Sequence, residues 1–390
     1  MVDFSFAANR KIIFGRNKTL SLAGVLNHGP ILAVTGQNVS RSENWNSLKQ
    51  EIEKKGLPLI HKILSGEPSP DDVDALCRET VSEHPAAVLA LGGGSVLDAG
   101  KAVSAMLCEP AVAEGIASVQ DFLEGVGTRE PSGARLPLYA VPTTAGTGSE
   151  CTKNAVISRP GADGFKKSLR HDNYIPDLAV IDSAWLNSLP QKTAASCGMD
   201  AFSQLLESYL STASSPFTDA LALEGLIRFS ESFSTLLDGK ASDADYDNIA
   251  LGACISGLTL ANAGLGTVHG IAGTLGGLGA LPHGTACGLL LPPVMKSTFG
   301  KLLAGDKQNE ALLKVQRLMN RDGKGLSVYE SVEQLVDQLQ TWSEQADLPG
   351  LGSFGFSPEL LKKAAETSGD KNNPCPFTPD ERLEFLHEIY

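Results

Sequence analysis

Asp200, His269 and His283 have the side-chain types of a divalent-metal site. A carboxylate and two imidazoles are common ligands of Zn²⁺ and Fe²⁺. The two histidines lie 14 positions apart (283 − 269 = 14), too far for a compact motif on one turn of a helix. Taken singly, each histidine also suits a hydrogen-bonded core position, and Asp200 suits a helix cap. The segment 248–295 contains no Asp, Glu, Lys or Arg. Because a buried carboxylate needs a partner, we expect Asp200 to meet the histidines or a metal.

A glycine-rich turn follows an apolar run in the first half of the chain. The run 86–91 leads into three glycines at 92–94 and then into Ser95, where we expect a helix to begin. Glycines let the backbone approach a diphosphate closely, and a helix N-terminus offers free N–H groups. The pattern is neither GxGxxG nor GxxxxGK[ST], and a plain tight turn has the same composition. Asp98 and Lys101 suit either ligand binding or pairing within the helix.

A second polar loop, PTTAGTGSE at 142–150, follows the strand-like run 138–141. Its hydroxyls and glycines suit contacts to ribose and phosphate, and they also suit a turn capped by Ser and Thr. Two such loops at the carboxyl ends of strands in one sheet indicate a nucleotide-binding crevice.

The elements that must position these residues differ between the two halves of the chain. Alternating strands and helices in the first half predict a parallel sheet covered by helices on both faces. Strands are expected at 11–14, 30–35, 57–64, 86–91, 138–141 and 178–182, with helices at 45–55 and 70–83. Helical patterns then take over, at 193–210, 216–237, 246–263, 309–319, 329–346, 358–367 and 379–389. We therefore predict an α/β domain over 1–185 and an all-helical domain over 186–390.

Composition excludes several classes of partner. The chain has 390 residues, of which 42% are hydrophobic and 20% charged, as in ordinary globular proteins. A net charge of -13 disfavours nucleic acid and anionic lipid surfaces. The first residues lack the apolar core of a signal peptide, and the seven cysteines show no CxxC spacing. We therefore expect reduced thiols and a cytoplasmic location. Glycine, proline and polar residues interrupt 248–295, so we interpret that segment as buried helices and not as a membrane span.

Together these motifs resemble the iron-containing (group III) alcohol dehydrogenase family. GGGSVLDAGK, PTTAGTGSE, the helix with Asp200 and PHGTACGLLLPPVM occur in the family's order and spacing. The match extends from IIFG near the start to KNNPCPFTPDE near the end. The resemblance implies a Rossmann-like N-terminal domain, an all-α C-terminal domain as in dehydroquinate synthase-like folds, and a cleft between them. It also implies a nicotinamide cofactor, a divalent metal, a small alcohol or aldehyde as substrate, and a homodimer.

The resemblance also carries cofactor-binding roles onto matching positions of this sequence. It assigns the cofactor diphosphate to Gly93, Gly94, Ser95 and Asp98, the adenosine and ribose side to Thr143, Thr144 and Thr147, and the neighbourhood of the ribose to Lys166.

Two positions depart from the family's metal region, in which an Asp is followed four positions later by His, then by HxxxH and PHG. Asp200, His269 and His283 match this pattern, but Gln204 and Gly273 replace the other two histidines. The expected metal ligands are therefore Asp200, Gln204, His269 and His283, around Fe²⁺ or Zn²⁺. A glutamine oxygen is a neutral, weaker ligand than imidazole. Gly273 removes the histidine to which the family assigns proton relay.

The cofactor preference rests on the turn after the run 30–35. NAD-preferring relatives often carry an Asp there that repels a 2′-phosphate, whereas this chain has Gly36 followed by Arg41. Loss of the carboxylate and gain of an arginine favour NADP over NAD. A plain surface turn with a solvated arginine is the alternative.

The function expected from these features is NAD(P)-dependent interconversion of a small alcohol and its aldehyde or ketone. In that reaction Asp200, His269 and His283 would carry the catalytic chemistry, with a metal as Lewis acid. The alternatives are a metal-independent reductase of the maleylacetate reductase kind and a nucleotide-binding protein that has lost its chemistry. A lyase of the dehydroquinate synthase type would need basic residues for an anionic substrate, and 248–295 supplies none.

Overall fold

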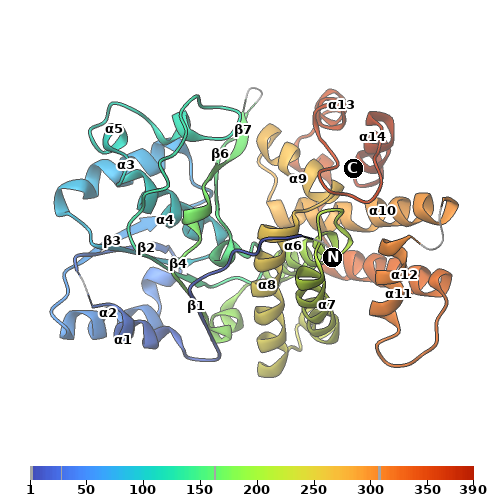
Figure 1. Cartoon of the computed structure of the whole chain (residues 1–390), viewed down its shortest axis with the longest axis horizontal. Helices are drawn as coiled ribbons and strands as arrows, with labels where there is room; N and C mark the ends of the chain where they lie inside the picture. Colours follow the sequence, from blue (N-terminus) through green and yellow to red (C-terminus); the bar gives the residue numbers. More distant parts are fainter. Residues whose placement is uncertain (1–2, 28, 162–163, 306–308) are drawn as a thin grey trace.

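The computed structural model describes residues 3–27, 29–161, 164–305 and 309–390. It has two halves of different construction, with a layered α/β half on the left of Figure 1 and a helical half on the right. The predicted combination of an α/β region and an all-helical region is confirmed.

The α/β half is built on a six-stranded sheet in the order β1-β8-β5-β4-β2-β3, in which every pair is parallel. The direction in which successive strands are added to the sheet reverses beside β2, because β3 lies on one side of β2 and the later β4 lies on the other. Ligands of open α/β sheets bind at such a switch point, outside the carboxyl ends of the strands. The strands are β1 (Lys11–Phe14), β2 (Ile31–Gly36), β3 (Leu59–Leu64), β4 (Ala87–Gly92), β5 (Leu138–Pro142) and β8 (Leu178–Ile181).

Helices cover both faces of this sheet, as predicted, because the buried strands are apolar on both sides. Ile31 and Ala33 of β2 pack with Trp45 on one face, while Leu32 and Val34 join the core on the other face. The first face is covered by α1 (Leu22–Val25) and α2 (Glu43–Lys54), and the second by α3 (Pro70–Thr80), α4 (Gly94–Met106) and the short α5 (Pro110–Ala113).

An antiparallel hairpin that the sequence analysis did not predict projects from the α/β half toward the helices (Figure 1). It consists of β6 (Asn154–Arg159) and β7 (Phe165–Arg170). Phe165 and Leu169 pack against the core of the α/β half, while the alternate residues of β7 are polar. This largely polar composition conceals the strand, since only Phe165 and Leu169 of its six residues are apolar.

The helical half contains most of the long helices. Several start at a serine or threonine cap; Ser215, Ser242 and Ser327 each form a capping box with the third residue of the helix. The helices are α6 (Gln191–Leu210), α7 (Pro216–Leu237), α8 (Asp243–Ala263), α9 (Thr267–Leu278), α10 (His283–Ala304), α11 (Glu310–Met319), α12 (Val328–Ala346), α13 (Pro358–Thr367) and α14 (Pro379–Glu388).

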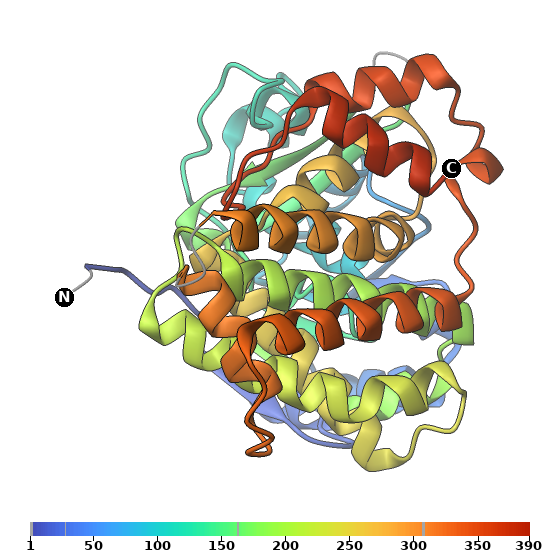
Figure 2. The same cartoon turned by 90° about the vertical axis from the view of Figure 1, so that its right-hand side faces the viewer.

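Figure 2 looks onto this half, with α13 and α14 in red at the top and α10 in orange beneath them. An aromatic cluster fixes α6, α7 and α12 together. In this cluster the Trp342 ring lies edge-on to Phe202 and Phe233, at centroid distances of 4.9 Å and 5.1 Å. Segment 248–295 forms α8, α9 and the first part of α10, and most of it is buried, as expected.

No single helix within the described residues is long and apolar enough to cross a membrane. The pair α8 and α9 passes that test only when combined, and it is bent by 96° at its break. The predicted domain boundary near residue 185 falls in a 3₁₀ segment, Ser183–Ser188, between the last sheet strand and α6.

Candidate active site

One wall of the site is the start of α4, directly after β4. Gly93 is the N-cap residue, and no described side chain caps the first N–H groups of the helix. Those groups and the positive end of the helix dipole are therefore available to an anion such as a diphosphate. Gly94, Ser95 and Asp98 line a cavity of about 250 Å³.

The loop after β5 packs tightly against this helix start. A Cβ on Gly94 would lie 2.5 Å from the Thr147 hydroxyl oxygen, and one on Gly93 would lie 3.3 Å from the Thr144 methyl carbon. Glycine is therefore required at 94 by close approach of the two loops. Thr147 lines the cavity, whereas Gly93, Thr143 and Thr144 are not among its lining residues. The Thr143 N–H donates to the Gly92 carbonyl at 2.9 Å, so this threonine joins the two loops.

Asp98 and Lys101 form a buried polar network beneath the cavity. The Lys101 ammonium donates to the Ser149 carbonyl at 2.9 Å and to the Thr152 hydroxyl at 3.1 Å, and the Ser149 hydroxyl donates to Asp98 at 2.5 Å. Burial lowers the pKa of Lys101 to about 8 and raises that of Asp98. Lys101 thus ties the β5–β6 connection to α4, while Asp98 combines this bonding with a place in the cavity wall.

Lys166 projects from the polar face of β7 into the cavity. Its ammonium lies 2.6 Å from a carboxylate oxygen of Glu67, which also lines the cavity. Lys166, Ser168 and Arg170 alternate along β7 and all line this space. The hairpin therefore places a row of polar and basic groups opposite the helical half.

Gly36 and Arg41 lie apart from the cavity lining, at the carboxyl end of β2. Arg41 ends a short 3₁₀ turn, Val39–Arg41, and is exposed. Because β2 neighbours β4 in the sheet, this turn lies on the same edge of the sheet as the glycine-rich turn after β4.

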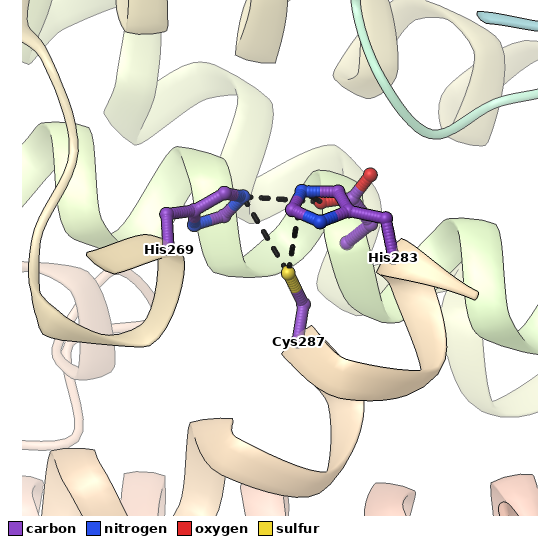
Figure 3. A group of neighbouring side chains, drawn as sticks. His269, His283 and Cys287 are labelled. Atoms are coloured by element: carbon purple, nitrogen blue, oxygen red, sulfur yellow. Dashed lines mark hydrogen bonds and ion pairs between the residues drawn. The ribbon is translucent and has the colours of Figure 1, made fainter. Parts of the chain in front are cut away.

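Three helices bring the predicted metal-site residues together, and Figure 3 shows two of them, His269 and His283, beside Cys287, which was not predicted. One carboxylate oxygen of Asp200 lies 3.1 Å from His269 Nε2 and 3.8 Å from His283 Nε2. The Gln204 amide donates to that same oxygen at 3.0 Å and accepts from the Ser256 hydroxyl at 2.8 Å. Sequence analysis expected Asp200 to pair with the histidines, and this contact is present.

Glu207 holds His269 in place from the other side. One of its carboxylate oxygens lies 2.7 Å from His269 Nδ1, and the other accepts the Val268 N–H at 2.7 Å. Burial opposes protonation of His269, but Cys287, Asp200 and Glu207 outweigh it and raise the pKa of His269 well above the usual value. A positive charge between the two carboxylates is therefore strongly favoured.

The pKa values of the other two groups fit a cation site. Burial acts to raise the pKa of Asp200, yet His283 and His269 lower it to about 2. Burial lowers the pKa of His283 to about 4 despite the nearby Asp200, so its imidazole is neutral at pH 7.

The residues present fit a divalent metal. When His269 donates from Nδ1 to Glu207, the lone pair on Nε2 faces an Asp200 oxygen across 3.1 Å. Two such acceptors repel each other unless a proton or a cation lies between them. Metal binding would replace the extra proton on His269.

Gly273 lies on α9, one turn beyond His269, and lines the same cavity. A Cβ built there meets no atom within 4 Å. The position expected for the family's relay histidine therefore faces open space.

Several site residues were not predicted. Glu207 lies seven positions after Asp200 and Cys287 four after His283, spacings that place each pair on one helix face. The sequence analysis looked for basic residues of the site only within 248–295, which contains none. Arg170 of β7 and Lys371, in the loop before α14, also line the cavity, and only tertiary structure brings them there.

Comparison with known proteins gives the same result for both halves. The family model described as "Iron-containing alcohol dehydrogenase" matches residues 9–183, and "Fe-containing alcohol dehydrogenase family, C-terminal" matches residues 194–390. The chain is 30% identical to "Alcohol dehydrogenase 4" of Saccharomyces cerevisiae over 366 residues, which are 92% of this chain and 90% of that protein. It is 36% identical to "Probable alcohol dehydrogenase EutG" of Salmonella typhimurium over 249 residues, 64% of this chain and 60% of that relative's length.

Among solved structures, the alcohol dehydrogenase from Oenococcus oeni superposes with a TM-score of 0.85 at 24% identity, over 100% of both chains. A 1,3-propanediol oxidoreductase gives the same TM-score at 22% identity, again over 100% of both chains. These likenesses confirm the fold. With family models matching both halves, the chain belongs to the iron-containing alcohol dehydrogenase family.

Proposed function

We propose that this oxidoreductase interconverts a small alcohol and its aldehyde or ketone with NADP(H), in a cleft that also holds a divalent metal. The observation that carries the proposal is a single cavity lined by the start of α4 and by His269 and His283. A cofactor site and a metal site that open into one space place a bound nicotinamide next to a bound substrate.

The chain's own residues have distinct tasks in this reaction. The N–H groups at the start of α4, with Ser95, would bind the cofactor diphosphate, Thr147 would line its adenosine and ribose side, and Lys166 would lie near the ribose. Asp200, His269 and His283 hold the divalent cation, which supplies Lewis-acid polarisation of the substrate oxygen when bound. Glu207 positions His269 through Nδ1 and so orients Nε2 toward the cation. A nicotinamide bound in this cavity would supply the hydride-transfer chemistry.

The proton required at the substrate oxygen has no histidine source at 273. Gly273 leaves an opening there, which favours solvent or a cofactor hydroxyl as the donor.

NADP preference is supported by the absence of a carboxylate at Gly36 and by Arg41 on the same sheet edge. The substitution Arg41→Ala should weaken binding of NADPH and leave NADH binding unchanged, as measured by calorimetry.

We also propose that residues 1–185 act as the dinucleotide-binding domain and 186–390 as the metal and substrate domain, and that the enzyme works as a homodimer.

The test of the function begins with elemental analysis of protein purified without chelator. Protein loaded with Fe²⁺ or Zn²⁺ should oxidise NADPH in the presence of at least one aldehyde of a broad panel. Chelation should abolish this activity, and added metal should restore it. The matched variant Asp200→Asn keeps side-chain size and removes the charge, so it should lose both metal and activity. Failure of every aldehyde with both cofactors would overturn the proposal.

A further inference from the structure

Four potential metal-ligand atoms surround one point in the active site, and the fourth belongs to Cys287. Its sulfur lies 3.6 Å from His269 Nε2 and 3.7 Å from His283 Nε2, as the dashed lines in Figure 3 show. The Asp200 oxygen completes the group, and all four atoms lie within 4.8 Å of one another. We propose that Cys287, and not Gln204, is the fourth protein ligand of the metal.

The dimensions of this group support the proposal. Metal–ligand bonds of about 2.0–2.3 Å place neighbouring ligands of a tetrahedral site about 3.3–3.8 Å apart. Four of the six distances between these atoms are 3.1, 3.6, 3.7 and 3.8 Å and the other two are at most 4.8 Å, so the four atoms need little movement to close on a cation.

Gln204 has another task. Its amide donates to Asp200 and accepts from the Ser256 hydroxyl, so both ends are already engaged. It acts as a positioning residue, since it fixes which oxygen of Asp200 faces the histidines. The neutral amide of Gln204 is a weaker metal ligand than imidazole, and the thiolate of Cys287, one helical turn beyond His283, takes the fourth ligand position instead.

The chemical consequence is a softer metal site than a carboxylate with three imidazoles would give. Binding of the cation at Cys287 replaces the thiol proton, which leaves to solvent as the metal–sulfur bond forms. One thiolate, two imidazoles and one carboxylate favour Zn²⁺ over harder cations. We therefore expect zinc to be retained more tightly than iron.

The test uses cobalt as a spectroscopic substitute in the intact protein. Metal-free protein loaded with one equivalent of Co²⁺ should show an intense thiolate-to-cobalt charge-transfer band in the near ultraviolet. Cys287→Ser should lose this band and bind Zn²⁺ at least about tenfold more weakly. Cys108→Ser, which changes a half-buried thiol just beyond α4, should keep both properties.

The possible results of this test distinguish failure of the Cys287 assignment from failure of the proposed function, on which the assignment rests. Bound cobalt without the band in unaltered protein would overturn the assignment of Cys287, even if aldehyde reduction continues. Unaltered protein that takes up no metal would overturn it as well. Because absence of the band in unaltered protein already overturns the assignment, the test can fail without relying on the folding of Cys287→Ser.

A second inference rests on an independent observation, the position of Lys371 in the cavity wall without a carboxylate of the described residues in ion-pair contact. This exposed residue lines the cavity together with His269, Gly273 and His283. Among the described residues no carboxylate lies within the 4.0 Å of an ion pair with it, whereas Lys166 pairs with Glu67 and Arg170 with Glu124. Its backbone adopts a φ of 48°, in the left-handed region that non-glycine residues seldom occupy.

The place of Lys371 is at the metal end of the cavity. The neighbouring Asn372 N–H donates to the Leu265 carbonyl at 2.9 Å, which fastens this loop beside α9. A negatively charged substrate group bound there would give Lys371 a direct ion-pair partner.

We infer that the preferred substrate carries a negatively charged group, such as a carboxylate, which Lys371 binds while the carbonyl carbon lies at the metal site. The proposal rests on the proposed function and names its substrate class. The open space beside Gly273 provides room for the substrate chain between these two points.

The test compares ω-oxo carboxylates of two to five carbons with their neutral amides of equal length. Unaltered protein should favour the carboxylate at the best length by about 10-fold to 100-fold in kcat/KM. Lys371→Met should bring that ratio toward one and leave the KM for NADPH unchanged. Lys167→Met, an exposed lysine of β7 outside the cavity, is the matched control.

A preference for amides at every length, or an unchanged ratio in Lys371→Met, would overturn this inference. A rise in the KM for NADPH of the same size would instead assign Lys371 to the cofactor. Loss of turnover with every aldehyde of the broad panel would count against the proposed function itself.

Discussion

At the scale of single residues, the site departs from the family pattern at positions that compensate for one another. Gln204 gives up metal binding for a hydrogen bond to Asp200, and the thiol of Cys287 approaches both histidines. Glu207 fixes the tautomer and direction of His269, a role that carboxylates often have behind metal-bound imidazoles. Gly273 leaves open the space that a histidine would fill.

Gly273 can therefore accept side chains without a clash. Gly273→Ala should stabilise the protein by about 0.5–1 kcal/mol, because glycine in a helix interior is entropically costly. Gly273→His should add an ionisation near pH 6.5 to the kcat profile, with aldehyde reduction falling as pH rises through it, because the protonated imidazole is the donor. Urea unfolding and pH profiles provide the measurements. A loss of stability in Gly273→Ala would show that the space is not free.

The buried carboxyl group of Glu150 should make the free energy of unfolding depend on pH. Burial raises its pKa to about 7, above the ordinary value of 4.5. A raised folded-state pKa contributes stability below pH 4.5 that is lost as pH rises through about 7. The amide variant Glu150→Gln lacks this loss, so by pH 8 it should be more stable than the unaltered protein by up to about 3 kcal/mol. Unfolding free energies between pH 4.5 and 8 measure the difference, and exposed Glu114→Gln should follow the unaltered protein.

At the scale of elements, the site depends on three kinds of junction. The β4–α4 turn presents free N–H groups, the β6–β7 hairpin presents basic side chains, and α6, α9 and α10 contribute the metal ligands. The close contact between Gly94 and Thr147 shows that the first junction depends on the loop after β5. We therefore expect cofactor affinity to depend on the spacing between these two loops as well as on the contacts that each loop makes with the cofactor.

A methyl group at position 94 tests this dependence. In Gly94→Ala the added Cβ would lie 2.5 Å from Thr147, so the loops must separate. We expect cofactor affinity to fall about tenfold or more, a loss of at least about 1.4 kcal/mol, as measured by calorimetry. Gly24→Ala, where a Cβ meets no atom within 4 Å, should bind as before. Equal affinity of the two variants would contradict the required close approach.

At the scale of the whole molecule, the apolar core of the helical half extends into the α/β half. Ala145, Cys151 and Ile181 of the α/β half belong to the same buried cluster as the helices. The N-terminal segment also reaches across, since the Phe6 and Phe217 rings lie 4.7 Å apart, edge to face. Gly148 and Gly257 bring the backbones of the two halves into contact.

This contact predicts that Gly257→Ala acts on both halves together. Its Cβ would lie 2.2 Å from the Gly148 carbonyl oxygen, and neither atom belongs to a flexible side chain. We expect a loss of about 1–3 kcal/mol of unfolding free energy, with weaker cofactor binding because Thr147 precedes Gly148. Gly300→Ala on α10, which has open space, should be neutral or stabilising. Denaturation and cofactor titration of both variants give the comparison.

The sequence by itself determined the parallel sheet, the helical second half and the residues that match the family motifs. The run Ala87–Gly92 is short and ends in a glycine-rich turn, which indicates a buried strand, so local pattern was sufficient there. Tertiary structure alone decided that Cys287 approaches His269 and that Lys371 lines the same cavity, because segments far apart in sequence must first pack together. The largely polar β7 was missed for the same reason: its apolar face has meaning only against the core it covers. Spacing identified which residues could carry chemistry, and packing determined which of them meet.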